Sequence, residues 1–592
     1  MPVTFNEDFW TQNGLQLNRP DLSCLRMNSM TYRTLLLQLR EEIAYDDSGI
    51  WLADEARAAQ KFDHFFNLAI ENHIELAITP EYSCPWTRLE KLLQEEKFPT
   101  RQHLWVLGMA SIHPAALQEM IASHEEVTWI FDRELLQESI QGSTDKFFDP
   151  LCYLFNTTDL GGSARKAIIV QFKNNPFGGA DAYWERDNII LGNTFYVLRN
   201  RQESVRLITL ICSDTLTDMN FNTLEEGKYL PLPLLILHIQ LNQSPFSENY
   251  KLYRNQLFSR GDKDANKEVI CLNWARKVYY NTDGGPADFN KVSGSAFYLK
   301  STKLTRSDAQ INANHKAGMY YTNWAPKRTH IYLLNFDEFV FLVENTKASE
   351  LAADPTQLNR TGPKLLRTFR WAENQWEVQE ARIDEGFGAL VSVVEGDQTG
   401  SLSCLSSNEN FLEVERMIQL VSGEISSKES WYSVSELQSF AVDDSELNNR
   451  VMSNQLGILQ KDVERKRKLN NYKVLKRGII TVAGNLPVGM NGANLGYLEL
   501  GGNRDRYLLN LHSHDGLMHA TGIYLGSIAE SDAKTIQKKV ADLFTDSQYG
   551  KNVLVWHETD QGRMRIPAHI ALPAITEKLN KKSHSIKKKK KR

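Results

Sequence analysis

Glu81, Lys173 and Cys212 each stand at or just past the end of an apolar run of the chain. A thiol becomes a competent nucleophile when a base takes its proton, and a carboxylate in a dry pocket can be that base. Attack on a carbonyl or nitrile carbon builds negative charge, which a lysine ammonium and the backbone N–H after the cysteine, here that of Ser213, can stabilise. These residue types therefore suit acyl transfer to sulfur.

Cys212 has a simpler interpretation as a small apolar residue that fills the core. The same interpretation is favoured for Cys84, which follows Glu81 closely and precedes Pro85-Trp86, so that we expect it to pack under the loop. A neighbouring ammonium favours the thiolate, and Cys212 is therefore expected to be more reactive than the other cysteines.

The elements that must position these residues are mostly short strands. Apolar, β-branched runs predict strands, and apolar residues at helical spacing predict helices. Strands that alternate with helices indicate an α/β fold, in which ligands bind beyond the carboxyl ends of the strands. The strands are expected at 31–39, 74–78, 103–111, 151–156, 164–173, 207–211, 234–240, 268–274 and 293–299, the helices at 54–72 and 250–259, and a strand with a short helix at 330–343, while 110–150 has the character of an insertion.

The order Glu, Lys, Cys, each after a hydrophobic strand, resembles the nitrilase (carbon–nitrogen hydrolase) superfamily. The similarity covers roughly residues 30–343 and no more. The segments that carry it are Leu37-Gln38 in the opening strand, the apolar-Pro-Glu motif at Ile78–Tyr82, the Ile-Cys-x-acid motif at Leu210–Asp214, Ser259-Arg260 followed by Val269–Asn273, and the small-residue strand Ser293–Phe297.

The resemblance implies a four-layer α-β-β-α sandwich and a Glu81, Lys173, Cys212 triad. Glu81 would deprotonate the thiol and later activate water, while Lys173 and the Ser213 amide hold the anion. Three departures stand out. Ser213 replaces the usual aromatic residue, and the Arg-Lys dipeptide of the family occurs at Lys166, near the start of its strand, whereas Lys173 stands at the strand end and is preferred. Glu185 is the candidate for the family's second glutamate, with a solvated loop acid as the alternative.

Domain boundaries follow changes in composition. The nitrilase-like domain is expected at 1–345, with a polar boundary segment at 345–363 that contains two prolines. An α+β region of unassigned fold and unknown role is expected at 364–575. Its clearest elements are strands at 389–394, 478–483 and 553–556 and helices at 445–471 and 531–544, and the basic tail 576–592 is expected to be disordered.

Composition excludes several classes of protein. The chain has 592 residues, a net charge of −5 and no apolar stretch long enough to span a bilayer, and its first residues lack the order of a signal peptide. Its six cysteines form no Cys-x-x-Cys pair, which argues against a disulfide framework and a zinc ribbon and favours the cytoplasm. The His-x-His-Asp motif at 511–515 lacks further ligands, so no metal is expected, and the glycines at 484–496 fit no phosphate-binding loop.

The sequence therefore predicts a cysteine-dependent amidase or nitrilase that hydrolyses a non-peptide C–N bond of a small molecule through an acyl-enzyme, without a cofactor. The family also implies a homodimer or larger assembly. Nucleic acid is not expected as a partner, except through the basic tail. Two alternatives stay open: a catalytically silent nitrilase-like scaffold, and an effector module in a multi-component, for example antiviral, system.

Overall fold

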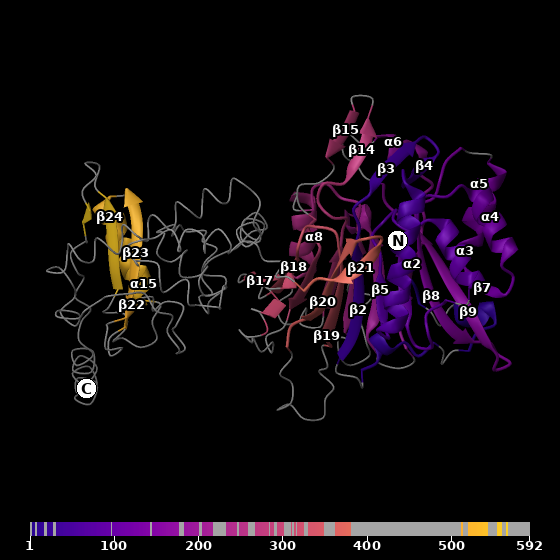
Figure 1. Cartoon of the computed structure of the whole chain (residues 1–592), viewed down its shortest axis with the longest axis horizontal. Coiled ribbons are helices and arrows are strands. Elements are labelled where there is room, and N and C mark those ends of the chain that lie inside the picture. The colour runs from indigo at the N-terminus through magenta and orange to yellow at the C-terminus, as the bar shows by residue number, and fades with distance from the viewer. Residues whose placement is uncertain are drawn as a thin grey trace, which may run out of the picture. The chain divides into compact units, whose positions relative to one another are not determined.

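Strands, several of them buried along their whole length, form two large sheets before residue 380 in the computed structural model (Figure 1). The chain separates into two units, the first built mainly from Met1–Asp384 and the second from the remainder. The described residues are 3–380, with gaps at 6–8, 17–19, 28–30, 96, 143–144, 177–182, 201–203, 217–232, 246–247, 259–266, 283–284, 289–292, 301–309, 311–312, 315–316, 325–328 and 348–360, and then 511–512, 519–527, 529–542, 553–558 and 564–565.

A nine-stranded mixed sheet carries the glutamate and the lysine of the site. Its centre is parallel, since β2 pairs with β5 and β5 with β6, while β8 and β9 form an antiparallel hairpin beside them. In sheet order the strands are β21 (Gln375–Val378), β20 (Lys364–Ala372), β19 (Phe339–Thr346), β2 (Thr31–Gln38), β5 (Leu76–Ile78), β6 (Leu104–Gly108), β8 (Pro150–Thr158), β9 (Ala164–Phe172) and β7 (Val127–Ile130).

An eight-stranded sheet carries the cysteine. Its strands β11, β12 and β13 are parallel, and every residue in them is buried, which is the pattern of strands covered on both faces. In sheet order the strands are β1 (Val3–Phe5), β10 (Phe195–Leu198), β11 (Arg206–Ile211), β12 (Leu234–Ile239), β13 (Lys267–Leu272), β16 (Ala296–Lys300), β18 (Thr329–Leu334) and β17 (Met319–Trp324). The side chain of Gln171 in β9 donates to the Thr209 carbonyl of β11 at 2.9 Å, so the two sheets are in direct contact.

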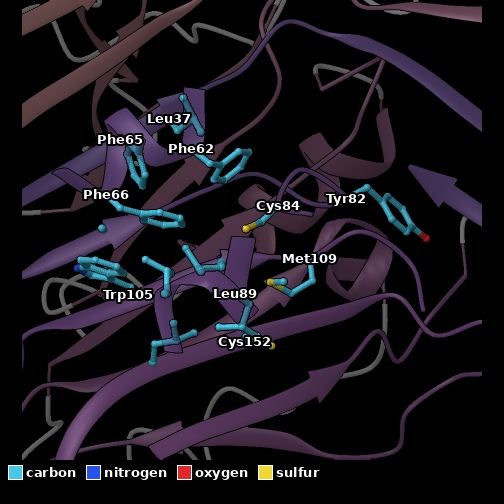
Figure 2. Packing of buried hydrophobic residues seen from close by; sticks show 14 of the residues in the cluster. Leu37, Phe62, Phe65, Phe66, Tyr82, Cys84, Leu89, Trp105, Met109 and Cys152 are labelled. Carbon is cyan, nitrogen blue, oxygen red and sulfur yellow. The ribbon is translucent and has the colours of Figure 1, made fainter. Parts of the chain in front are cut away.

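The helices between residues 55 and 141 pack apolar faces on the nine-stranded sheet. Asp54 caps the first of them by accepting from the backbone N–H of Arg57. Phe66 of this helix stacks on Trp105 of β6 with ring centroids 5.1 Å apart, and Figure 2 shows this cluster together with Phe62. The helices of the first unit are α2 (Glu55–Glu71), α3 (Trp86–Gln94), α4 (Pro114–Ser123), α5 (Arg133–Gln141), α6 (Tyr183–Asn188) and α8 (Glu248–Leu257).

A small four-stranded sheet joins two segments that lie far apart in the sequence. The hairpin β3 (Glu42–Asp46) and β4 (Gly49–Leu52) follows the first strand of one large sheet. The hairpin β14 (Tyr279–Thr282) and β15 (Gly285–Asp288) follows β13 of the other, and β14 pairs with β3 in parallel (Figure 1). This small sheet is therefore built from a hairpin that follows a strand of each large sheet.

Most predicted elements of the first unit are confirmed, with two corrections, to the short helix and to the boundary. The predicted short helix within 330–343 is wrong, because this range holds the strands β18 and β19. The predicted insertion at 110–150 contains α4, β7 and α5, and β7 adds an edge strand to the sheet by pairing with β9. The boundary predicted at 345–363 is too early, because β20 pairs with β19 and extends the same sheet, so that the unit reaches about Asp384.

The second unit contains a described four-stranded sheet and one helix. The elements are β22 (Leu511–His512), β23 (His519–Ser527), α15 (Glu530–Asp542), β24 (Val553–Glu558) and β25 (Met564–Arg565), which confirm the predicted helix at 531–544 and strand at 553–556. The elements predicted at 389–394, 445–471 and 478–483, the glycines at 484–496 and the tail 576–592 lie outside the described residues. Among the described helices, none has the length and apolar character that a membrane span requires.

Candidate active site

The first acid of the site sits in a tight turn at the end of β5. Gly108 makes the turn possible, because a Cβ there would lie 2.1 Å from the Pro80 carbonyl oxygen. The Ser83 hydroxyl donates to that same carbonyl at 2.6 Å, and Tyr82 adopts a positive φ of 56°. The turn leaves the Glu81 side chain 1% exposed.

The lysine of the site is Lys173, directly after β9. Its Nζ lies 2.8 Å from Glu81 Oε1, 2.5 Å from Glu185 Oε1 and 3.4 Å from Asp149 Oδ2. Lys166 is elsewhere: its Nζ donates to the Leu93 carbonyl at 3.0 Å. The structure thus brings together Glu81, Lys173 and Glu185, and it places the alternative lysine outside the group.

Charge balance in this group is uneven, since three buried carboxylates surround one ammonium. Burial lowers the pKa of Lys173, but the surrounding acids outweigh burial and raise the pKa well above its usual value. Burial raises the pKa of Glu81, partly offset by Lys173, and burial together with the Glu81 charge raises the pKa of Asp149 well above its usual value. A proton is therefore expected on Asp149, because adjacent carboxylates in a dry site do not all ionise.

The cysteine stands where β11 passes into a 3-10 turn, Cys212–Leu216. Cys212 has a φ of 42°, in the left-handed region that few residues other than glycine adopt, and its side chain is buried. Strain of this kind persists only where the surrounding structure holds it, and it clusters at functional sites. The predicted place of Cys212 at a strand end is confirmed.

Asp214 ties this turn to the segment after Lys173. Its Oδ1 accepts the backbone N–H groups of Asn174 at 2.8 Å and Asn175 at 3.0 Å. Its Oδ2 accepts the N–H of Ile211 at 3.1 Å. One carboxylate thus joins the ends of β9 and β11, and with them the lysine and the cysteine.

Ser213, which replaces an aromatic residue in the resemblance, has a second link to the same segment. The Ser213 hydroxyl donates to the Asn175 carbonyl at 2.5 Å, and the Asn175 amide donates to the Ser213 carbonyl at 2.8 Å. The small side chain is thus used to hold the turn in place.

The Cys212 thiol lies in a dry environment with mixed charge. Its Sγ is 3.4 Å from the Tyr250 hydroxyl of α8. Burial raises the pKa of the thiol well above its usual value, the Glu81 charge raises it further, and Lys173 lowers it. Lys173 therefore favours the thiolate, as expected, but burial and the Glu81 charge outweigh this effect, so attack by Cys212 requires a base to take the proton.

Several residues of the site were missed in the sequence. The backbone N–H of Leu241 donates to Glu81 Oε2, and the Trp274 indole donates to the Glu81 carbonyl at 2.8 Å. Asp149 was predictable in principle, because the hairpin register that pairs Pro150 with Phe172 places the residue before Pro150 opposite Lys173. Leu241 and Trp274 carry no such signal, since their contacts are between the two sheets.

The remaining candidates do not join this group. Cys84 packs in the core with Leu89 and Met109, as predicted (Figure 2). In the ranges that the structure describes, all the cysteines are free and no cluster of His, Cys, Asp and Glu could hold a metal. Only Leu511 and His512 of the His-x-His-Asp motif are among the described residues.

Solved structures of carbon–nitrogen hydrolases are similar to this chain. One is a CN-hydrolase superfamily protein from Xanthomonas campestris with an arsenic adduct in its active site, at 11% identity and a TM-score of 0.26, covering 45% of this chain and 83% of that one. Another is a carbon–nitrogen hydrolase from Helicobacter pylori, at 11% identity and a TM-score of 0.25, covering 46% of this chain and 82% of that one. No protein-family model and no curated protein matches the chain. The family of these structures is the one that the sequence resembles.

Proposed function

We propose that the first unit is a cysteine-dependent hydrolase that cleaves a non-peptide C–N bond of a small amide or nitrile. The observation that carries the proposal is the Lys173 ammonium held between Glu81 and Glu185, at 2.8 and 2.5 Å, within electrostatic reach of a strained Cys212. An acid, an ammonium and a thiol in one dry site are the parts that acyl transfer to sulfur needs.

The reaction has two halves. In the first, Glu81 takes the thiol proton while Cys212 Sγ bonds to the carbonyl carbon, and Lys173 with the Ser213 N–H stabilises the oxyanion. The C–N bond then breaks, and the amine leaves with the proton from Glu81. In the second half, Glu81 takes a proton from water, the hydroxide attacks the thioester, and the S–C bond breaks as Glu81 returns the proton to the sulfur and regenerates the thiol.

The raised pKa of Glu81 suits both halves, because a base with a pKa nearer the working pH can also return the proton. None of these steps uses a metal or an organic cofactor. The four-layer sandwich, self-association and a cytoplasmic location are part of the same proposal.

Release of ammonia from a panel of small primary amides tests the function. The full chain is expected to release ammonia from at least one of them, and Cys212→Ser is expected to release none. If wild type and Cys212→Ser do not differ across amides and nitriles, the hydrolase proposal fails.

One observation favours a second candidate, a catalytically silent scaffold or effector module. Cys212, Glu81 and Lys173 are only 3%, 1% and 1% exposed, so substrate must displace something to enter. The ammonia assay separates the two candidates, because a catalytically silent module releases no ammonia from any amide.

A further inference from the structure

His238 is a buried imidazole on β12, the strand next to that of the nucleophile. Its Nε2 lies 3.0 Å from the backbone carbonyl oxygen of Cys212, which also accepts from the Thr215 hydroxyl at 3.2 Å. The carbonyl can only accept, so Nε2 carries the hydrogen and donates it. The contact is to the main chain of the reactive residue, and neither half of the proposed reaction uses it.

The other ring nitrogen has a partner that fixes this tautomer. Cys271 Sγ lies 3.7 Å from His238 Nδ1, on the neighbouring position of β13. Burial lowers the pKa of His238 to about 3 and raises that of Cys271 to about 12, so the imidazole is neutral and the thiol keeps its proton. The S–H therefore points to a bare Nδ1. The Gln240 amide donates to the same sulfur at 2.6 Å.

The ring is also held by aromatic neighbours from α8. Tyr250 stacks on it with centroids 6.0 Å apart, and Tyr253 meets it edge-on at 5.8 Å. Tyr250 is the residue whose hydroxyl lies 3.4 Å from Cys212 Sγ. His238 and Tyr250 thus form one packed pair that touches both the backbone and the thiol of the nucleophile.

The carbonyl that His238 holds belongs to the peptide bond between Cys212 and Ser213. A trans peptide is planar, and its C=O and N–H point in opposite directions. A donor that fixes the Cys212 carbonyl therefore also fixes the direction of the Ser213 N–H. This control matters here, because Cys212 is in the left-handed region, a conformation that persists only where neighbouring contacts hold the backbone.

We propose that His238 is a positioning residue that orients the oxyanion-stabilising N–H of Ser213 by holding the Cys212 carbonyl. The inference rests on the proposed hydrolase function. It adds that neutral His238, with its hydrogen on Nε2, sets the efficiency of acyl transfer without touching the substrate.

The test compares two reactions of Cys212 in the full chain. Alkylation by iodoacetamide needs the thiolate but no oxyanion site, whereas acylation by 4-nitrophenyl acetate needs both. His238→Leu and His238→Asn lose the donor at the Nε2 position, and we expect acylation to slow by about 10²-fold with alkylation changed only a few-fold. His238→Gln places an amide N–H near the Nε2 position and is expected to keep acylation near the wild-type rate.

Circular dichroism and the unfolding midpoint identify the folded variants. The inference is overturned if His238→Asn slows both reactions equally or leaves acylation unchanged. It is also overturned if folded His238→Gln loses acylation. Absence of acylation at wild-type Cys212 overturns the proposed function instead.

Discussion

Lys173 Nζ and Glu81 Oε1 lie 2.8 Å apart in a site where both side chains are almost completely buried. Breaking such a pair by removing one partner leaves an uncompensated buried charge. The same two residues are, in the proposed reaction, the oxyanion stabiliser and the base. Stability and chemistry are therefore coupled here and must be measured together.

Lys166 within β9 and Lys173 directly after it offer a matched comparison. Lys173→Met leaves the buried acids without a cation to pair with, and we expect it to lower the free energy of unfolding by about 3–5 kcal/mol. It should also slow Cys212 acylation at least about 10²-fold. Lys166→Met loses one hydrogen bond to the Leu93 carbonyl, and only about 1 kcal/mol is expected. Urea unfolding and ester acylation of both variants check this, and similar effects of the two changes would contradict the role of Lys173.

Asp149 is expected to be neutral in the resting site, because burial and the Glu81 charge raise its pKa. Asp149→Asn keeps the shape and the neutral state, so the unfolding free energy should change by no more than about 1 kcal/mol and acylation only a few-fold. Glu185→Gln is the comparison, since it removes the acid 2.5 Å from Lys173 and should cost clearly more in both measurements. If Asp149→Asn lowers the unfolding free energy and the acylation rate as much as Glu185→Gln does, Asp149 is ionised.

The site residues that directly follow the ends of strands could be predicted from the sequence. Glu81, Lys173 and Cys212 follow β5, β9 and β11, and strand ends can be recognised from apolar runs that stop. Asp149 required the hairpin register as well. The contact of His238 with the Cys212 carbonyl required the order of strands in the sheet, which local patterning does not contain.

Asp214 predicts a pH dependence of stability. Burial outweighs its backbone hydrogen bonds and raises its pKa from 3.8 to about 7. The native state therefore binds this proton more tightly than the unfolded state, and the free energy of unfolding falls as the pH rises from about 4 to about 7, by at most about 1.4 kcal/mol per pH unit from this group. Glu81 and Asp149 act in the same direction.

Asp214→Asn isolates that contribution. Urea unfolding at pH 5 and pH 7.5 should show a smaller loss of stability with rising pH in the variant than in the wild type. Asp159→Asn serves as a control, because Asp159 is a surface acid whose pKa is lowered. An identical pH slope in wild type and Asp214→Asn would contradict the raised pKa.

The corrected domain boundary predicts the behaviour of two fragments. Residues 1–384 contain β20 and β21, whose Phe369 and Trp376 belong to the core, and Trp376 donates to the Lys61 carbonyl at 3.0 Å. This fragment should unfold cooperatively. Residues 1–350 lack both strands and leave the edge of β19 unpaired, so we expect aggregation or a lower unfolding midpoint. A fragment 1–350 as stable as 1–384 would restore the earlier boundary.

The boundary was misplaced for a physical reason. The segment 345–363 is polar and contains prolines, which is the composition of a linker, but the same composition suits a loop between neighbouring strands. The pairing of β19 with β20 decides between them, and it depends on residues on both sides of the segment. In contrast, the helix α2 was predictable, since its apolar spacing and its Asp54 cap are local.

Acylation of Cys212 by 4-nitrophenyl acetate, followed by peptide mapping of the full chain, tests the central claim most directly. The thiol pKa is raised, so transfer must depend on Glu81 as the base. The acetyl group is expected on Cys212 ahead of Cys24, Cys84, Cys152 and Cys271, and Glu81→Gln should slow this labelling by about 10²-fold with the fold intact. Equal labelling of Cys84 and Cys212, or a rate that does not respond to Glu81→Gln, would contradict the catalytic account and leave the silent scaffold.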